Sequence, residues 1–242
     1  MNTLSRKQNE MREREARILE LARRYLQQGY HNLSMHQIAR DLQYSTGTIY
    51  NHFKNKEEIV IALVIQTMKV RVDLFRRARD WKALPRERLQ AIGIASELFV
   101  QLYPDYFNVE QLVRSDALWE KTSEERRHAM HSCESGCIGV VAGVVSEGVQ
   151  QGQLTLPNGF TCEDLVFGLW SLHYGAFTIM ATSSSLDQLG IKDPRNALHV
   201  ATNSLLDGYG FKPLSSEYDY HAVRERIRLE VFPHEFEQVE GC

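Results

Sequence analysis

Residues 38–56, IARDLQYSTGTIYNHFKNK, contain two short helical patterns separated by a break of only a few residues. Each pattern has one apolar side, formed by Ile38, Ala39 and Leu42 in the first and by Ile49 and Phe53 in the second. Ser45 is placed to cap the second helix. Two helices this short bury little apolar surface alone, so further helices must pack around them. Such a pair is typical of helix-turn-helix proteins, whose second helix enters the major groove of DNA.

The second helix carries side chains suited to DNA. Threonine offers a hydroxyl and a methyl group to base edges, and Gly47 leaves room for a close approach of the backbone. Asn55 is placed to cap the following helix, with Glu58 completing a capping box, and that helix N-terminus is a potential phosphate site. The predicted DNA contacts are Ser34, His36, Tyr44, Ser45, Thr46, Gly47, Thr48, Tyr50, Asn51, His52 and Lys56.

The run from Arg17 to Glu58 resembles the DNA-binding domain of the tetracycline-repressor (TetR) family of bacterial regulators. The matching residues are Ile18-Leu19, Ala22, Gly29-Tyr30, Ser34, Ile38-Ala39, Ser45, Gly47-Thr48-Ile49-Tyr50, His52-Phe53 and Lys56-Glu57. The sequence departs from the family at Tyr44, usually a small aliphatic residue, and at Gln43, where glycine is common. The resemblance implies a homodimeric repressor that occupies a double-stranded operator and leaves it when a small molecule binds. The rest of the chain matches the family only in length and helical pattern.

Charge is divided along the chain in the same way. Residues 1–56 hold ten Lys and Arg against five Asp and Glu, whereas residues 57–242 hold eighteen against twenty-six. The overall net charge of −3 therefore combines a basic N-terminal part with an acidic remainder. This division fits a small DNA-facing domain joined to a larger body.

The periodicity predicts an all-α protein with two domains. Residues 1–56 form a three-helix, helix-turn-helix DNA-binding domain, and residues 57–242 form a helical effector-binding and dimerisation domain, with 57–80 as a linking helix. Capping boxes are expected at Ser34–Gln37 and Thr122–Glu125. The expected helices cover about 10–28, 34–42, 46–53, 56–79, 86–102, 105–118, 123–151, 162–183, 194–208 and 217–231.

Two of the later helices have faces that could meet a partner. One carries a row of small residues, Ala197, Ala201, Ser204 and Gly208, and the other an apolar row, Leu165, Leu169, Leu172 and Ala176. The rows could pack within one chain. They could also form a two-fold dimer, which would place two recognition helices on a pseudo-palindromic operator.

Aromatic residues suggest where an effector could bind. One wall would lie on the helix at 162–183 and another near 99–119. The predicted ligand contacts are Phe107, Trp119, Trp170, His173, Tyr174 and Phe177, which would suit an apolar or aromatic effector. The same aromatic residues could equally be core, with His173 a hydrogen-bonded core residue.

Cys133 and Cys137 lie four residues apart, next to His128, His131 and Glu134. They could be small core residues, or they could sense oxidation or bind a metal. No metal ligand set and no cofactor is predicted. The two cysteines nevertheless leave an alternative open. The chain could be a DNA-binding regulator without a small effector, controlled by a partner protein or by cysteine redox or metal chemistry.

Motifs of catalysis and of membrane insertion are missing from the sequence. It contains no zinc-protease, nucleophile-elbow or phosphate-loop motif, so an enzyme is not expected and no catalytic residue is predicted. The best apolar run, Ile59–Ile65, is too short to cross a bilayer. A cytoplasmic protein without membrane contact is expected.

Overall fold

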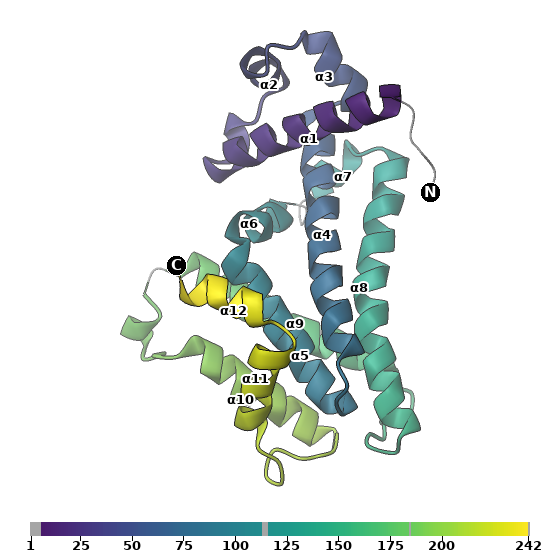
Figure 1. Cartoon of the computed structure of the whole chain (residues 1–242), viewed down its shortest axis with the longest axis vertical. Helices are drawn as coiled ribbons and strands as arrows, with labels where there is room; N and C mark the ends of the chain where they lie inside the picture. The colour runs from purple at the N-terminus through teal and green to yellow at the C-terminus, as the bar shows by residue number, and fades with distance from the viewer. Residues whose placement is uncertain (1–5, 113–115, 184, 242) are drawn as a thin grey trace. The chain divides into compact units, whose positions relative to one another are not determined.

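The computed structural model describes residues 6–112, 116–183 and 185–241, and all regular structure among them is helical (Figure 1). The helices of the N-terminal half are α1 (Arg6–Gln27), the 3-10 turn η1 (Tyr30–Asn32), α2 (Met35–Asp41), α3 (Thr46–His52), α4 (Lys56–Asp80) and α5 (Pro85–Leu102). Those that follow are α6 (Pro104–Leu112), α7 (Asp116–Glu120), α8 (Glu124–Gln150), α9 (Cys162–Thr182), η2 (Asp187–Leu189), α10 (Pro194–Gly208), α11 (Tyr220–Glu230) and α12 (Pro233–Glu240). The predicted all-α class is confirmed.

The chain forms two compact units. The first consists of Met1–Lys69 with Tyr103–Cys133, and the second of Val70–Leu102 with Glu134–Cys242. Both α4 and α8 therefore contribute to both units. The first unit contains the predicted DNA-binding domain of residues 1–56 together with the start of α4, α6, α7 and the start of α8.

A small apolar centre holds the helix-turn-helix together. Side chains from α1, from α2 and from α3 with its C-cap are completely buried there: Ile18, Ala22, Ile38, Ile49 and Phe53. Burial of a large aliphatic or aromatic side chain contributes about 1.5–3 kcal/mol. The apolar positions that defined the sequence pattern therefore form this centre, and the opposite sides of α2 and α3 remain available.

Charged residues at the start of α5 organise the second unit. Arg86 is completely buried, with its Nη2 2.7 Å from Asp207 Oδ1 and its guanidinium carbon 4.7 Å from the ring centroid of Tyr220. Glu87 accepts hydrogen bonds from Tyr218 and Arg226. These contacts hold the end of α10, the segment that follows it and α11 against α5.

The C-terminal segment is part of this second core. Phe232 is completely buried beneath Arg77, whose guanidinium carbon lies 4.9 Å from the ring centroid, and Arg77 also binds Glu235 of α12. The sequence predicted a helix over 217–231 but not α12, which begins at Pro233 and packs on α5.

Most helix boundaries match the prediction, but two capping boxes do not form. Ser34 occupies the N-cap of α2 without a side-chain hydrogen bond, so the predicted Ser34–Gln37 box is wrong. The Thr122 hydroxyl donates backwards to the carbonyl of Leu118 instead of capping α8. In place of the helix predicted over 105–118 the structure has α6 and α7; residues 113–115 of that prediction lie outside the described residues.

Helix α9 is a longer apolar segment than the one that the sequence analysis identified. By length and composition alone it is the one helix among the described residues that could cross a membrane, although the sequence had pointed to Ile59–Ile65. Core helices of soluble proteins pass the same test, so one such helix is weak support for a membrane span. Its apolar surface instead needs an explanation in terms of protein contacts.

Candidate nucleic-acid interface

The turn between α2 and α3 depends on a left-handed residue. Gln43 has φ 57°, whereas L-residues with side chains rarely adopt positive φ. The backbone N–H of Tyr44 then donates to the carbonyl of Ala39 at 2.9 Å, which closes the turn. This geometry explains why a glycine is common at the position of Gln43 in proteins that this sequence resembles.

Helix α3 begins as predicted at Ser45. The Ser45 Oγ accepts from the backbone N–H of Thr48 at 3.1 Å, and the two hydroxyl oxygens lie 2.8 Å apart. This pair fixes the orientation of the Thr48 hydroxyl at the end of the helix that would face DNA. The cap therefore both starts the helix and positions a predicted contact.

The remaining predicted contacts of α3 are accessible. Tyr50 is 48% exposed, and Gly47 and Asn51 are also exposed. Half-buried positions include Ser34, Tyr44, Thr46, Thr48, His52 and Lys56, whereas His36 and Ser45 are exposed. The predicted residues thus occupy one continuous stretch from the start of α2 to the start of α4, with α3 between them.

Helix α1 is tied to α2 by a hydrogen bond from the Tyr25 hydroxyl to the Asp41 carboxylate. This bond lowers the pKa of Asp41, and it raises the pKa of Tyr25. Arg40 donates to the same carboxylate at 2.9 Å. The end of α2 therefore has a fixed position before the turn.

The N-terminus of α4 is capped by Asn55, as the sequence predicted. Its Oδ1 accepts from the backbone N–H of Glu58 at 2.9 Å. The ammonium of Lys56 lies 4.1 Å from the ring centroid of Tyr30, a cation–π contact that leaves the lysine half-buried. Tyr30 also donates to Glu57 at 3.1 Å.

A polar network connects this helix start to the loop before α8. Glu58 accepts from the backbone N–H of Ser123 at 3.2 Å, and Lys121 Nζ lies 3.2 Å from Glu57. Burial opposes ionisation of Glu58, but hydrogen bonds from Ser123 and Lys54 hold its pKa below the usual value. No local pattern in the sequence predicts these contacts, because the partners are more than sixty residues apart.

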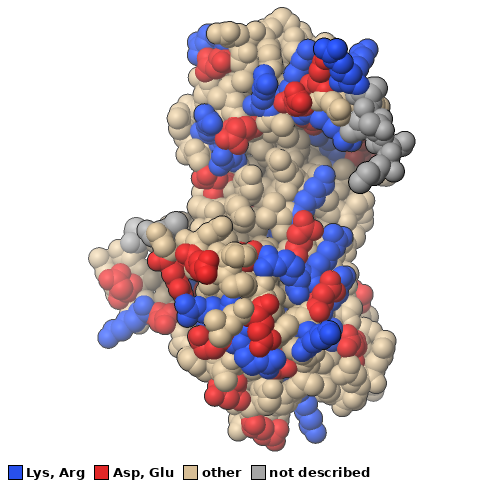
Figure 2. Space-filling model, in the orientation of Figure 1, with Lys and Arg blue, Asp and Glu red and all other residues tan. Residues whose placement is uncertain are grey.

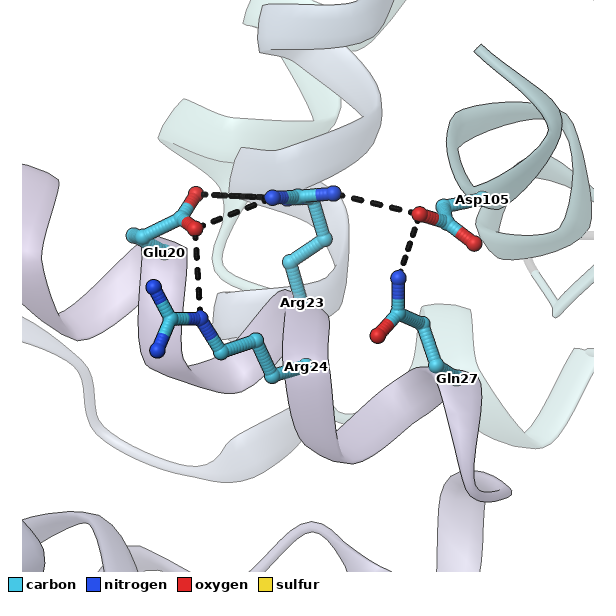
Figure 3. Close-up of polar contacts among 5 residues, drawn as sticks. All are labelled: Glu20, Arg23, Arg24, Gln27 and Asp105. Carbon is cyan, nitrogen blue, oxygen red and sulfur yellow. Dashed lines mark hydrogen bonds and ion pairs between the residues drawn. The ribbon is translucent and has the colours of Figure 1, made fainter. Parts of the chain in front are cut away.

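Helix α1 is also joined to α6. Figure 3 shows Arg23 between two carboxylates, with Nη2 2.9 Å from Glu20 and Nη1 3.1 Å from Asp105. Gln27 donates to the same Asp105 carboxylate. The hydrogen bond from Arg23 lowers the pKa of Glu20. A segment predicted to belong to the effector domain is thereby bound to the DNA-binding helices.

The predicted ligand contacts are divided between the two units. Phe107 is buried and Trp119 half-buried in the first unit, whereas the other four belong to α9 in the second unit. On α9 the aromatic residues divide between two faces. Trp170 packs edge-on against Phe167 and Tyr174, and His173 packs edge-on against Phe177.

The face with His173 points into the second unit. Its Nδ1 lies 2.9 Å from the carbonyl of Leu169, which can only accept, so Nδ1 carries the proton. A Cβ on Gly93 would lie 3.0 Å from the other ring nitrogen, so glycine there permits the close packing of α5 and α9. Burial lowers the pKa of His173, which favours the neutral form of this half-buried ring.

Near His173 lies a charged cluster that the sequence did not reveal. Glu97 of α5 is buried, and its carboxylate lies 2.9 Å from His199, 3.4 Å from Arg195 and 3.8 Å from Arg224. Burial opposes ionisation of Glu97, but the close contact with His199 and the positive charges of Arg224 and Arg195 outweigh it and keep the pKa low. The residues come from three helices, so spacing along the chain carries no signal for them.

The cysteines on α8 have no metal-site geometry. Cys133 and Cys137 are both half-buried. Across the described residues, no group of three or more His, Cys, Asp or Glu side chains is arranged to hold a metal ion. His128 instead lies 3.8 Å from Glu124 on the same helix.

Two short helices with buried apolar sides, a left-handed turn between them and an exposed polar side on the second helix define a helix-turn-helix domain, which is typical of regulators of transcription. Residues 18–63 match the family model described as bacterial regulatory proteins, tetR family. The chain belongs to the TetR family and is a DNA-binding transcriptional regulator, in a family that is not enzymatic.

Relatives extend this result over more of the chain. The sequence is 25% identical over 178 residues to the fatty acid metabolism regulator protein of Bacillus subtilis (strain 168), covering 69% of this chain and 88% of the relative. The fold resembles FadR from Bacillus subtilis in complex with stearoyl-CoA, with a TM-score of 0.55, 23% identity and coverage of 79% and 95%. It also resembles a putative regulator from Saccharomonospora viridis in complex with choline, with a TM-score of 0.62, 22% identity and coverage of 81% and 96%.

Proposed function

We propose that this chain is a cytoplasmic homodimeric repressor that occupies a pseudo-palindromic operator and is released by a small-molecule effector. The observation that carries this proposal is the division of α3 into two sides. Ile49 is completely buried, while Gly47, Tyr50 and Asn51 are exposed next to the hydroxyl of Thr48. Thr48 would contact a base or a nearby phosphate, Tyr50 a phosphate, and Lys56 the backbone beside the start of α4.

Dimerisation is supported by an exposed apolar surface on α9 and α10, two helices that pack on one another. On α9, Phe167 is 64% and Trp170 41% exposed, and on α10 Val200 is 57% exposed. The small residues Ala197, Ser204 and Gly208 are exposed beside Val200 and would let a partner helix approach closely. We assign this outer surface, named the α9–α10 face, to the two-fold interface.

The α9–α10 face differs from the one that the sequence suggested. Leu165 and Leu169 are buried within the chain, so the apolar row of α9 predicted for the partner packs internally. Trp170, predicted as a ligand contact, lies on the exposed side of α9 with Phe167. We therefore assign Trp170 to the dimer and keep it out of the effector site.

Within the second unit, the effector would contact the inner aromatic side chains of α9, His173 and Phe177. Two regulators with this fold were solved with stearoyl-CoA and with choline, and both ligands carry apolar groups. We propose an apolar or aromatic effector for this chain. It would stabilise a state in which the two DNA-binding domains no longer match successive major grooves.

The test begins with the DNA itself. Duplexes are selected from a random-sequence pool with the purified full-length chain, and stoichiometry is measured on the enriched duplex. The proposal expects an inverted-repeat sequence bound by two chains. Enrichment of no sequence would contradict operator binding, and one chain per site would contradict the dimer.

Effector control is tested on the same complex. Stearoyl-CoA, choline and a set of aromatic acids are added, and release is followed by fluorescence anisotropy. Release by one of them at micromolar concentration supports the proposal. Release by an oxidant or by Zn²⁺ alone would favour control through Cys133 and Cys137 instead.

A further inference from the structure

Helix α1 begins well before the part of the chain that matches the family. The match starts at residue 18, whereas α1 starts at Arg6, so about three turns of helix precede it. From Arg6 to Arg17 every residue except Glu15 is exposed. A helical segment with no buried side needs a reason other than packing within the chain.

The exposed turns are basic, and most of the basic side chains lack an anionic partner. Arg6 is paired with Glu10 at 3.1 Å. The other basic residues have no ion pair within the described chain: Lys7, Arg12, Arg14 and Arg17. Lys7 and Arg14 are seven residues apart and Arg14 and Arg17 three apart, so these three lie on one side of the helix.

The surface view agrees with this pattern. In Figure 2, Lys and Arg side chains gather over the first turns of α1, with some Asp and Glu side chains between them; the sequence there includes Glu10, Glu13 and Glu15. We name the side formed by Lys7, Arg14 and Arg17 the α1 basic side.

Helix α1 passes close to the end of α3 at Glu15, which lies on a different side of α1 from Lys7, Arg14 and Arg17. The guanidinium of Arg126 lies 3.9 Å from Glu15 and, by its central carbon, 4.8 Å from the ring centroid of Phe53. Phe53 is the C-cap of α3. At about 1.5 Å per residue, the turns before Glu15 extend roughly 14 Å from this point, a length that spans several phosphates of one DNA strand.

We propose that the first turns of α1 are a second DNA-binding element, in which Lys7, Arg14 and Arg17 contact the phosphate backbone flanking the bases read by α3. The inference rests on the proposed function, because α3 must first place the domain on the operator. Contacts to phosphates add affinity and salt dependence without adding sequence preference. The flanking base pairs therefore contribute by their presence and not by their identity.

The experiment uses the inverted-repeat duplex selected by the wild-type chain, in two lengths. One duplex ends at the selected sequence, and the other carries about eight further base pairs on each side. The triple variant Lys7→Gln, Arg14→Gln, Arg17→Gln removes the charge while keeping residues that favour helix. A second variant, Lys7→Arg, Arg14→Lys, Arg17→Lys, retains the charge.

Wild type and the charge-retaining variant are expected to bind the long duplex at least tenfold more tightly than the short one. The Gln variant is expected to lose that difference, and its salt slope on the long duplex should fall by about 2 to 5 ions per dimer. A matched control replaces three exposed lysines of the second unit, Lys82→Gln, Lys192→Gln and Lys212→Gln. This control should keep the wild-type difference in affinity between the two duplexes and the wild-type salt slope.

Two results would overturn the inference while leaving the proposed function intact. The Gln variant could bind both duplexes as wild type does, or the lysine control could lose as much affinity as the Gln variant, which would indicate a general charge effect. Failure of the wild type to enrich any duplex would instead contradict the proposed function. Circular dichroism of each variant checks that α1 remains helical.

Discussion

The carboxylate of Glu58 accepts a hydrogen bond from the backbone N–H of Ser123 at 3.2 Å, joining the start of α4 to the start of α8. Arg126 of α8 approaches the same carboxylate at 3.6 Å and covers the ring of Phe53. Together with the Arg23–Asp105 contact, this means that α6, α7 and the first turns of α8 belong to the same compact unit as α3. A signal that moves those segments would act directly on the DNA-binding helices.

Glu58→Ala should therefore destabilise the first unit. The variant leaves the N–H of Ser123 and the guanidinium of Arg126 without their acceptor, at a cost of about 1–3 kcal/mol. Urea unfolding at pH 7 measures the change, with the exposed Glu125→Ala as the control. Equal stability of the two variants would show that the bond to Ser123 contributes nothing.

The same residue gives a pH test. The pKa of Glu58 is lowered in the folded chain, so its contribution is complete above the unfolded value of about 4.3 and is lost as pH falls through the folded value. The difference between wild type and Glu58→Ala should thus shrink below about pH 4.5. A difference that stays constant down to pH 3 would argue against the ionised carboxylate as its source.

Gln43→Gly should stabilise the protein. Gln43 holds φ 57°, where glycine has no steric cost, and the gain should be about 0.5–1 kcal/mol after allowing for the greater freedom of glycine in the unfolded chain. Gln43→Ala should give no such gain, because alanine meets the same strain. Thermal or urea unfolding measures the free energy of unfolding of both variants and of wild type. A Gln43→Gly variant less stable than wild type would contradict this interpretation of the turn.

The sequence predicted the features whose signals lie within a few residues. Ser45 and Asn55 cap α3 and α4 as expected. A cap needs only its own turn of helix, so local pattern is enough. The Ser34–Gln37 box shows the limit, since the right residue types were present but the side-chain bond did not form.

Contacts between distant segments could not be predicted from patterns within a few residues of sequence. Glu97 meets its partners through the packing of α5 against α10 and α11, which no spacing in the sequence encodes. The division of α9 could have been found, because Phe167, Trp170 and Tyr174 follow the three- and four-residue spacing of one helical side. His173 and Phe177 follow the same spacing on another side, and only the aromatic content was used in the prediction.

The recognition helix can be tested residue by residue. Thr48→Ala and Tyr50→Ala should each weaken binding to the selected duplex by about 1–3 kcal/mol, whereas Lys56→Ala should weaken binding to all duplexes and reduce the salt slope by about one ion per subunit. Thr48→Ser keeps the hydroxyl that meets Ser45, so it separates loss of the methyl group from loss of the cap. Unchanged affinity in all three alanine variants would contradict the placement of α3.

The buried Glu97 should stabilise the second unit. Glu97→Gln removes the negative charge that faces Arg195, His199 and Arg224, and we expect a loss of about 1–3 kcal/mol at pH 7. Since the pKa of Glu97 is lowered, the loss should diminish as pH falls below about 4.3. Urea unfolding at pH 7 and pH 4 measures the loss of stability at each pH, with the exposed Glu163→Gln as the control. A Glu97→Gln variant as stable as wild type at pH 7 would show that the charge of Glu97 does not stabilise the second unit.

The α9–α10 face can be tested without disturbing the core of either unit. Val200 is more than half exposed in the isolated chain, so Val200→Asp should leave the fold of the monomer intact. In a dimer, however, the introduced carboxylate would be buried against an apolar surface without a partner, which costs several kcal/mol at each of two symmetric positions. Sedimentation should show a monomer, and affinity for the full inverted repeat should fall toward that for a half-site, while circular dichroism and the melting of the monomer stay as in wild type. Val200→Ala keeps the surface apolar and should remain dimeric. A Val200→Asp chain that still sediments as a dimer and binds the inverted repeat at full strength would place the interface on another surface.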